Sequence, residues 1–256
     1  MRKSAIAKKN PPFFVLILGF GICMAMCWGI WVQDSNSAAI PQREQGPMSL
    51  IDAVILDVPY INQRERYPTG CESVSTVMAL QYVGVDITVD EFVDNYLAMG
   101  TLPATGINGE KIGCDPWEAF PGSPYSQYGY GCYAPVIVSA VNKFIDSNTF
   151  EVQELYGKPI EELCKDYIDK EIPVVFWATI DMKPAQITNS WTDEATGKRI
   201  NWVAPMHCLL LVGYDDNFYY FNDPWQRKAC AYRKSVVKAA YEGMFEQAIV
   251  IKPVKA

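Results

Sequence analysis

His207 is the only histidine in the chain, and it begins an apolar run that ends at a glycine and two acidic residues. A second apolar run, residues 218–221, follows directly after the turn Asp215-Asp216-Asn217. Two short β-forming runs joined by such a turn predict a hairpin. The hairpin would return Asn222 or Asp223 to the side of His207. Because histidine changes charge near neutral pH, the pair predicts acid–base chemistry with an oriented imidazole.

Cys71 is the predicted nucleophile. It follows the turn-forming Pro68-Thr69-Gly70, and apolar residues then recur at helical spacing, at Val74, Val77, Met78 and Tyr82, before Gly84 ends the run. A helix N-terminus carries about half a positive charge and free N–H donors, and both favour a thiolate. We therefore expect a lowered pKa for Cys71. A thiolate beside a protonated His207 is the activated pair of a cysteine hydrolase.

An oxyanion site is also expected next to Cys71. Attack on a carbonyl places negative charge on its oxygen, and the backbone N–H of Cys71 lies in the first helical turn, where it could donate to that oxygen. A second donor is needed, and the side chain of Gln63, eight residues upstream, is the candidate. In this scheme His207 protonates the leaving group while Asp223 holds the ring through its other nitrogen.

The order of these residues resembles the papain superfamily of cysteine peptidases. The closer similarity is to family 39 of the cysteine peptidases, the double-glycine leader peptidases, and their stand-alone C39-like relatives in bacteria. The residues that carry it span most of 54–225: Val58-Pro59-Tyr60, Gln63, Cys71, Val74, Met78, Tyr82, Gly84, His207, Gly213-Tyr214-Asp215 and Asn222-Asp223-Pro224. The resemblance implies a papain-like α+β fold and a peptide or protein substrate, with Cys71, His207, Asp223 and Gln63 as the catalytic set. It favours Asp223 over Asn222, because Asp223 precedes Pro-Trp as the papain-type asparagine precedes Ser-Trp.

The sequence departs from the family pattern at two points. Glu72 follows the cysteine where a glycine is common, and the interval between Gln63 and Cys71 is longer than in the transporter-linked members. The chain also has no ATP-binding transporter module, so cleavage coupled to export is not implied.

Two other functions use the same residues. A transglutaminase-like acyl transferase would pass the acyl group from Cys71 to an amine instead of water. A non-catalytic binding module would keep the fold for peptide or partner recognition, and the charge of Glu72, which would raise the pKa of the neighbouring thiol, favours this alternative.

The elements that must position these residues follow an α+β order. Helical patterns come first, over residues 71–82, 88–98, 135–146 and 160–170, and Thr88 with Glu91 has the form of a capping box. Strand patterns cover residues 54–60, 174–180, 199–203, 208–212, 218–221 and 247–252, with one late helix over 234–242. Residues 100–131 are rich in glycine and proline and predict a long loop region. We expect a mainly antiparallel sheet.

The N-terminal part predicts a membrane anchor. Residues 1–12 are basic, residues 13–32 form an uncharged apolar span of bilayer length, residues 33–50 have the composition of a stalk, and residues 51–256 form the peptidase domain. Basic residues before the span keep that end in the cytoplasm. This predicts a single-pass protein of the bacterial cell membrane with its domain outside. A cleaved signal peptide is the alternative, in which case the domain is secreted.

Composition limits the partners. The net charge of −7 argues against a nucleic-acid partner, since a phosphate backbone attracts basic proteins. A single histidine and no closely spaced cysteines predict no metal site, and the chemistry needs no cofactor. The oligomeric state is left open. Of the six cysteines after the apolar span, Cys114 and Cys132 are the expected disulfide pair.

Overall fold

A computed structural model describes residues 53–254. The predicted segments 1–12, 13–32 and 33–50 lie outside the described residues. The main sheet has the strand order β12-β11-β10-β7-β13-β6, with β1 paired to β10, and its pairs are antiparallel. Its strands are β1 (Val54–Ile55), β6 (Phe150–Tyr156), β7 (Val174–Thr179), β10 (Met206–Tyr214), β11 (Phe218–Asn222), β12 (Cys230–Arg233) and β13 (Gln247–Pro253).

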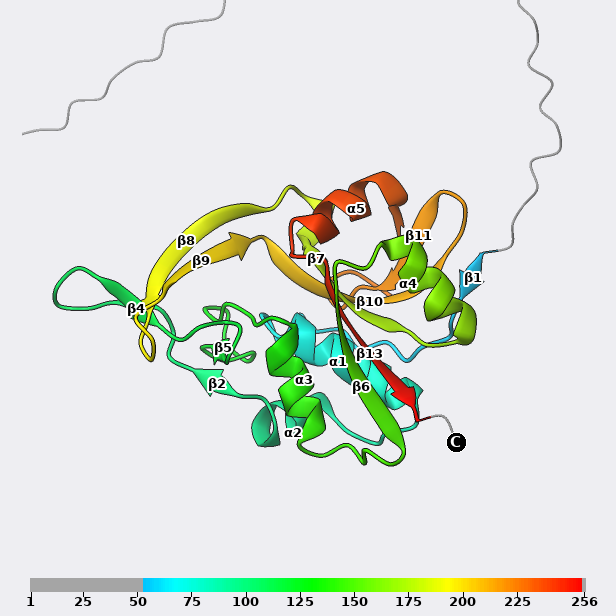
Figure 1. The fold of residues 1–256 in the computed structure, drawn as a ribbon, viewed down its shortest axis with the longest axis horizontal. Helices are drawn as coiled ribbons and strands as arrows, with labels where there is room; N and C mark the ends of the chain where they lie inside the picture. The colour runs from blue at the N-terminus through cyan, green and yellow to red at the C-terminus, as the bar shows by residue number, and fades with distance from the viewer. Residues whose placement is uncertain (1–52, 255–256) are drawn as a thin grey trace, which may run out of the picture. The chain divides into compact units, whose positions relative to one another are not determined.

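Helices cover both faces of this sheet (Figure 1). The described helices are α1 (Cys71–Tyr82), α2 (Val89–Asn95), α3 (Ala134–Asn142), α4 (Ile160–Asp166) and α5 (Lys234–Glu242), with 3-10 turns at Ile168–Lys170 and Ile180–Met182, and α2 packs on α1. The Ser75 hydroxyl of α1 donates to the Cys208 carbonyl of β10, while Tyr241 of α5 stacks on Phe176 of β7. Successive residues of a strand face opposite sides. The Cys208 side chain faces α1, where Ser75 contacts it, and Trp177, its partner on β7, lies on the same face. Phe176 therefore faces the other side of the sheet, which α5 covers.

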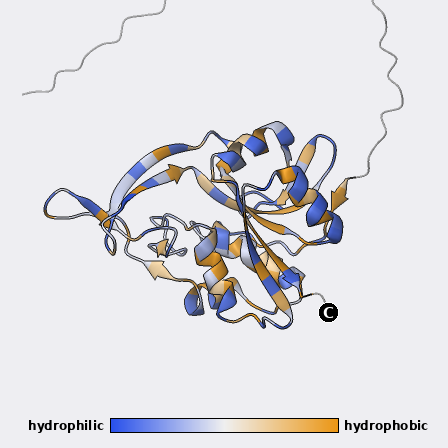
Figure 2. Cartoon of the chain, viewed as in Figure 1, coloured by the Kyte–Doolittle hydropathy of each residue, from blue (hydrophilic) through white to orange (hydrophobic). Residues whose placement is uncertain are grey.

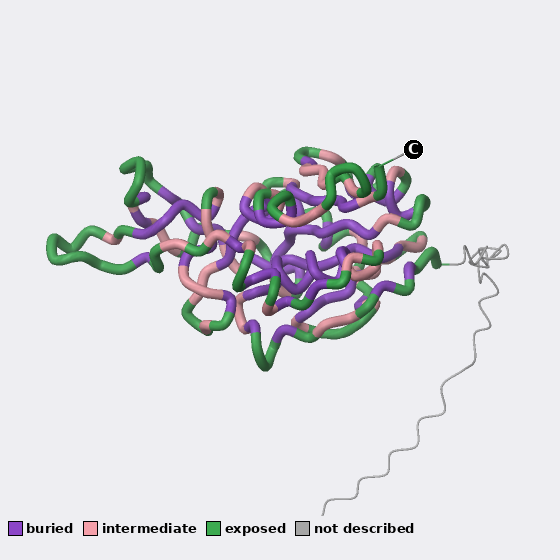
Figure 3. Tube along the Cα trace, turned by 90° about the horizontal axis from the view of Figure 1, so that it is seen from below, coloured by how far each residue is buried: buried purple, intermediate pink, exposed green. Residues whose placement is uncertain are grey.

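The core lies between these layers. The middle strands β7, β10 and β13 are apolar along most of their length (Figure 2) and mostly buried. Figure 3 shows the buried residues gathered in the interior, with exposed residues around them. Continuous apolar runs are expected for strands that are covered on both faces. Gly213 lets β1 approach β10, because a Cβ at this position would lie 2.2 Å from the Val54 carbonyl oxygen.

Two smaller sheets extend from the body. One is a four-stranded arm of β3 (Ala104–Thr105), β4 (Lys111–Gly113), β8 (Gln186–Asp193) and β9 (Arg199–Ala204), which projects from the main sheet (Figure 1). The other pairs β2 (Met99–Gly100) with β5 (Phe120–Pro121). Strand β9 of the arm ends at Ala204 and β10 of the main sheet begins at Met206, so a single residue connects the two sheets. The predicted loop region over 100–131 therefore contains four short strands.

The structure has the predicted mixture of helices with an antiparallel sheet. The bounds predicted for α1 and α5 are confirmed, and so is the β10–β11 hairpin, in which Asp215 Oδ1 accepts from the N–H groups of Asn217 and Phe218. The capping box of Thr88 and Glu91 is present, although α2 ends three residues earlier than predicted. Strands β6, β8 and β12 are not among the predicted strands. Within residues 53–254, no helix has both the length and the apolar content that a bilayer span needs.

The expected disulfide between Cys114 and Cys132 is wrong. All six cysteines of the described region are free thiols, and each is buried. The Cys114 sulfur approaches the Ala119 carbonyl oxygen at 3.9 Å, whereas the Cys132 carbonyl accepts from the Trp177 indole in the core. Free cysteine packs as a small apolar residue, and these positions use it in that way.

Candidate active site

His207 and Asp223 form a buried pair at one end of the β10–β11 hairpin. His207 Nε2 lies 2.8 Å from Asp223 Oδ1, and the side chains are 3% and 1% exposed. His207 is the second residue of β10, and Asp223 directly follows β11. Because Asp223 occupies Nε2, the remaining ring nitrogen, Nδ1, is the one available for proton exchange with a nucleophile.

Asn222 does not contact His207 and has a structural role instead. Its amide nitrogen donates to the carbonyls of Val58 and Pro59, and its side-chain oxygen accepts from the N–H of Ala229. It therefore holds the incoming N-terminal segment against β11. Adjacent residues of an extended chain point to opposite sides, so only one of Asn222 and Asp223 can face His207. In the structure that residue is Asp223.

Several donors hold the Asp223 carboxylate ionised. Burial raises its pKa, but hydrogen bonds and charge interaction from His207, with further hydrogen bonds from Tyr232 and the Trp225 N–H, outweigh burial and bring the pKa below its ordinary value of 3.8. Tyr232 Oη donates to Oδ2 at 2.7 Å. An ionised Asp223 keeps the imidazole ring of His207 oriented.

Cys71 is the first residue of α1 and is 5% exposed. Its thiol interacts with the backbone N–H of Cys208, the residue that follows His207. Helix α1 thus brings Cys71 to the start of β10, although 137 positions of sequence separate it from Cys208. The Cys71 N–H has no acceptor within the helix, as is general for the first residue of a helix, and can serve an oxyanion. No hydrogen bond joins the thiol to the imidazole; the thiol instead donates to Glu72 Oε2 at 3.4 Å.

The expected lowering of the Cys71 pKa is wrong for this structure. Burial first, and then the negative charge of Glu72, raise the pKa of the Cys71 thiol well above its usual value. Glu72 itself is fully buried, and burial raises its pKa to about 7. The positive end of α1 and the Cys208 N–H act in the opposite direction but are outweighed. The thiol therefore rests in its neutral form.

Gln63 lies close to the loop that leads into α1. Its amide nitrogen donates to the carbonyls of Tyr67 and Pro68, at 3.2 and 3.4 Å, and its backbone N–H donates to the Pro224 carbonyl. The side-chain oxygen is buried and has no hydrogen-bond partner. Gln63 thus links the segment before Cys71 to the turn after Asp223. To act as an oxyanion donor, its amide must exchange one of these carbonyls for the substrate oxygen.

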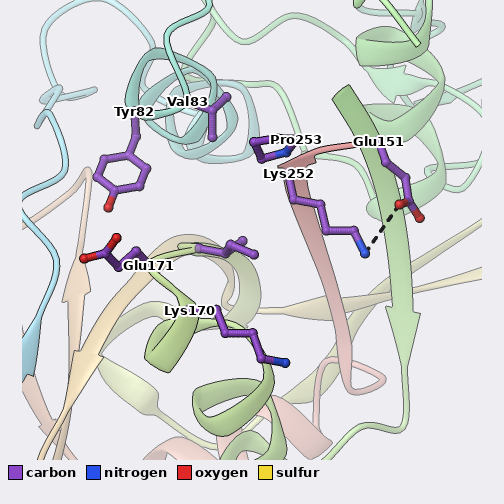
Figure 4. Close-up of a pocket in the computed structure, with 8 residues that line it drawn as sticks. Tyr82, Val83, Glu151, Lys170, Glu171, Lys252 and Pro253 are labelled. Carbon is purple, nitrogen blue, oxygen red and sulfur yellow. Dashed lines mark ion pairs between the residues drawn. The ribbon is translucent and has the colours of Figure 1, made fainter. Parts of the chain in front are cut away.

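Two cavities differ in how they lie relative to this arrangement. One of about 730 Å³ lies where β6, β13 and the 3-10 turn Ile168–Lys170 meet the last turn of α1. Figure 4 shows Lys252 paired with Glu151 at its edge. It is at the opposite end of α1 from Cys71 and is not part of the candidate site. Another, of about 460 Å³, is bordered by Ala204 and Pro205 and lies next to the start of β10. Over residues 53–254, no cluster of acidic, cysteine or histidine side chains is arranged to hold a metal ion.

The sequence profile of the Peptidase_C39 like family matches residues 55–249, which include nearly all of the elements described above. The chain therefore belongs to this family of C39-like peptidase domains.

Two relatives extend this comparison. The chain is 27% identical over 223 residues to the uncharacterized protein YvpB of Bacillus subtilis (strain 168), covering 86% of this chain and 82% of YvpB. A crystal structure of a candidate C39-like peptidase from Bacillus anthracis superposes with a TM-score of 0.67 at 27% identity, covering 80% of this chain and 98% of the other. The fold is thus shared over nearly the whole described region.

Two residues of the site do not follow from the sequence. Tyr232, which donates to Asp223, lies on β12, a strand that the sequence pattern does not predict. Glu72 stands out in the sequence only as a departure from the family pattern. Its burial is not foreseeable, because the groups that enclose it come from distant parts of the chain. Neither residue belongs to a motif that would identify it.

Proposed function

We propose that this chain is a thiol peptidase of papain-like architecture that hydrolyses peptide bonds outside the cytoplasmic membrane. The observation that carries the proposal is the buried His207–Asp223 pair, which leaves Nδ1 of the ring free. The cysteine that begins α1 interacts with the backbone N–H of Cys208, the residue after His207. Family membership supports the same chemistry. The extracytoplasmic location rests on the apolar span over residues 13–32 alone.

In this mechanism the Cys71 thiol gives its proton to His207 Nδ1, and the sulfur attacks the peptide carbonyl carbon. The Cys71 N–H, with the Gln63 amide as proposed second donor, stabilises the oxyanion. His207 then passes the proton to the leaving amine, and a thioester to Cys71 remains. Water, deprotonated by His207, attacks the thioester, releases the carboxylic acid and restores the thiol. Asp223 stabilises the imidazolium throughout.

The cavity beside Pro205 is where we expect part of the substrate. It is bordered by Ala204, Pro205 and Gln186, at the junction between the β8–β9 arm and the start of β10. A peptide that occupies it lies next to the strand that carries His207. The arm would then contribute to substrate selection while the main sheet carries the reacting groups.

The test is an assay of the full-length chain in detergent with a library of internally quenched peptides. Cleavage by the wild-type chain should fall by at least about 10³-fold in Cys71→Ala and in His207→Ala, since removal of either member of a nucleophile–base pair costs that order of rate. An added primary amine that captures the acyl group faster than water does would indicate acyl transfer.

The non-catalytic alternative has its own supporting observation, the raised pKa of the Cys71 thiol. It requires that wild type and Cys71→Ala bind the same peptides equally and cleave none of them. That result would reject the peptidase proposal.

A further inference from the structure

Glu72 is a buried acidic side chain in direct contact with the nucleophile. It is the second residue of α1 and is fully buried, and its Oε2 lies 3.4 Å from the Cys71 sulfur. Among the described residues, no lysine, arginine or histidine forms an ion pair with it. An unpaired buried carboxyl is costly to the fold, so its place beside Cys71 calls for an explanation.

The surrounding backbone is shaped to receive this carboxyl. Cys132 N–H donates to Glu72 Oε1 at 2.6 Å, and Gly131 adopts a φ of +134°. A Cβ at Gly131 would lie 2.6 Å from Oε1 and 2.1 Å from the end of Met206. On the far side, the indole of Trp177 donates to the Cys132 carbonyl and holds that residue in place. The backbone around residues 131 and 132 is therefore shaped to hold the Glu72 carboxyl.

The groups that face Glu72 are neutral. They are the thiols of Cys71 on α1 and Cys208 on β10, with the Cys132 thiol and the Tyr133 phenol from the segment that leads into α3. Burial raises the pKa of Glu72 to about 7, so both protonation states are populated near neutral pH. The state of Glu72 decides whether a negative charge lies beside the sulfur.

We propose that Glu72 is a positioning residue that controls the reactivity of Cys71. The ionised carboxylate accepts the thiol hydrogen and holds Cys71 as a neutral donor, facing away from His207. When Glu72 takes a proton from solvent, it loses this charge, and the thiol is free to give its proton to His207 Nδ1. This inference rests on the proposed function of Cys71 as nucleophile. It makes the site more reactive on the acid side of neutrality, where Glu72 is protonated, than a permanently ionised carboxylate would allow.

The test measures alkylation of Cys71 by iodoacetamide in the full-length chain from pH 5 to 9, read by mass spectrometry. Glu72→Gln keeps the shape and an acceptor for the Cys132 N–H but removes the charge. We expect Cys71 of this variant to react at least about tenfold faster than wild type at pH 8, which corresponds to about one unit in the midpoint of the pH profile.

Glu161→Gln is the matched control. It removes one carboxylate from α4, where Glu161 accepts from Tyr219 of β11, and should leave the Cys71 profile unchanged. If Glu72→Gln folds and shows the wild-type profile, Glu72 only stabilises the segment around Cys132, and the proposal is overturned.

Should Glu72→Gln fail to fold, the wild-type profile decides. The proposal requires the plot of log rate against pH to flatten near pH 7, where ionisation of Glu72 opposes that of Cys71, and a uniform slope of one would overturn it. Alkylation needs no peptide cleavage. A chain that shows the coupling but cleaves nothing keeps the inference about Glu72 and rejects only the peptidase.

Discussion

Asp223 is the most heavily hydrogen-bonded side chain of the candidate site. Its Oδ1 accepts from His207 Nε2 and from the N–H groups of Trp225 and Gln226, and its Oδ2 accepts from Tyr232. These donors fix the ring of His207 with Nδ1 turned outward from the pair. An asparagine at position 223 could accept most of the same hydrogen bonds, but it would lack the negative charge.

This arrangement predicts a graded loss of activity. Asp223→Ala should lower kcat/KM by about 10²-fold or more, because His207 loses both its orienting acceptor and its counter-charge. Asp223→Asn keeps the acceptor and should lose only about tenfold. Steady-state kinetics at pH 7 with a cleaved peptide would measure both. Equal rates for the two variants and wild type would remove Asp223 from the mechanism.

Glu72 also makes stability depend on pH. Its pKa in the folded chain is about 7, against 4.5 for an ordinary glutamate, so folding favours the protonated form. The stabilisation is fully present below about pH 4.5, is lost as the pH rises toward 7, and changes no further above it. Glu72→Gln should therefore be more stable than wild type at pH 8, by at most about 3 kcal/mol, and no more stable at pH 4.5. Thermal unfolding at the two pH values tests this, and parallel shifts at both would contradict it.

At the scale of elements, the site is assembled by one helix end and one hairpin. Helix α1 begins at Cys71, where Gly70 ends the preceding turn, and Ser75 anchors its next turn to β10 through the Cys208 carbonyl. The hairpin turn of Asp215 sets the register that returns Asp223 to His207. The segment 131–133 then closes over the start of the helix.

Gly131 is the sensitive point of that closing segment. Gly131→Ala would place its Cβ against Glu72 and Met206 at a φ of +134°, and we expect a loss of about 2–3 kcal/mol in the free energy of unfolding. Gly157→Ala is the matched control, since Gly157 also has positive φ (+62°) but no atom within 4 Å. It should lose only about 1 kcal/mol. Chemical denaturation would compare them, and equal losses would show that the contact with Glu72 is not tight.

At the scale of the whole chain, the composition of residues 13–32 predicts a membrane anchor. We expect the full-length protein to sediment with membranes and a chain lacking residues 1–32 to remain in solution, because a span of 20 apolar residues matches the bilayer. Fractionation tests this. If the mature protein begins within residues 35–40, the span is a cleaved signal and the domain is secreted.

Much of the fold could be predicted because its information is local. Helical spacing after Cys71, the capping box of Thr88 and Glu91, and the Asp-rich turn before β11 each lie within a dozen residues, and the structure contains all three. Strand β8 does not follow from the sequence, because much of it is polar and exposed on the arm, and it lacks the continuous apolar run of β7.

The candidate site likewise has features that follow from the local sequence and features that follow only from long-range packing. The residue types and order of Cys71, His207 and Asp223 are enough by themselves to indicate the family, and the proposed chemistry rests on them. The protonation state of the thiol and the burial of Glu72 depend on segments 60 to 137 positions away. The free state of the described cysteines likewise follows from how the chain packs. A pKa is set by what surrounds a group in space, and that is decided only when distant segments pack together.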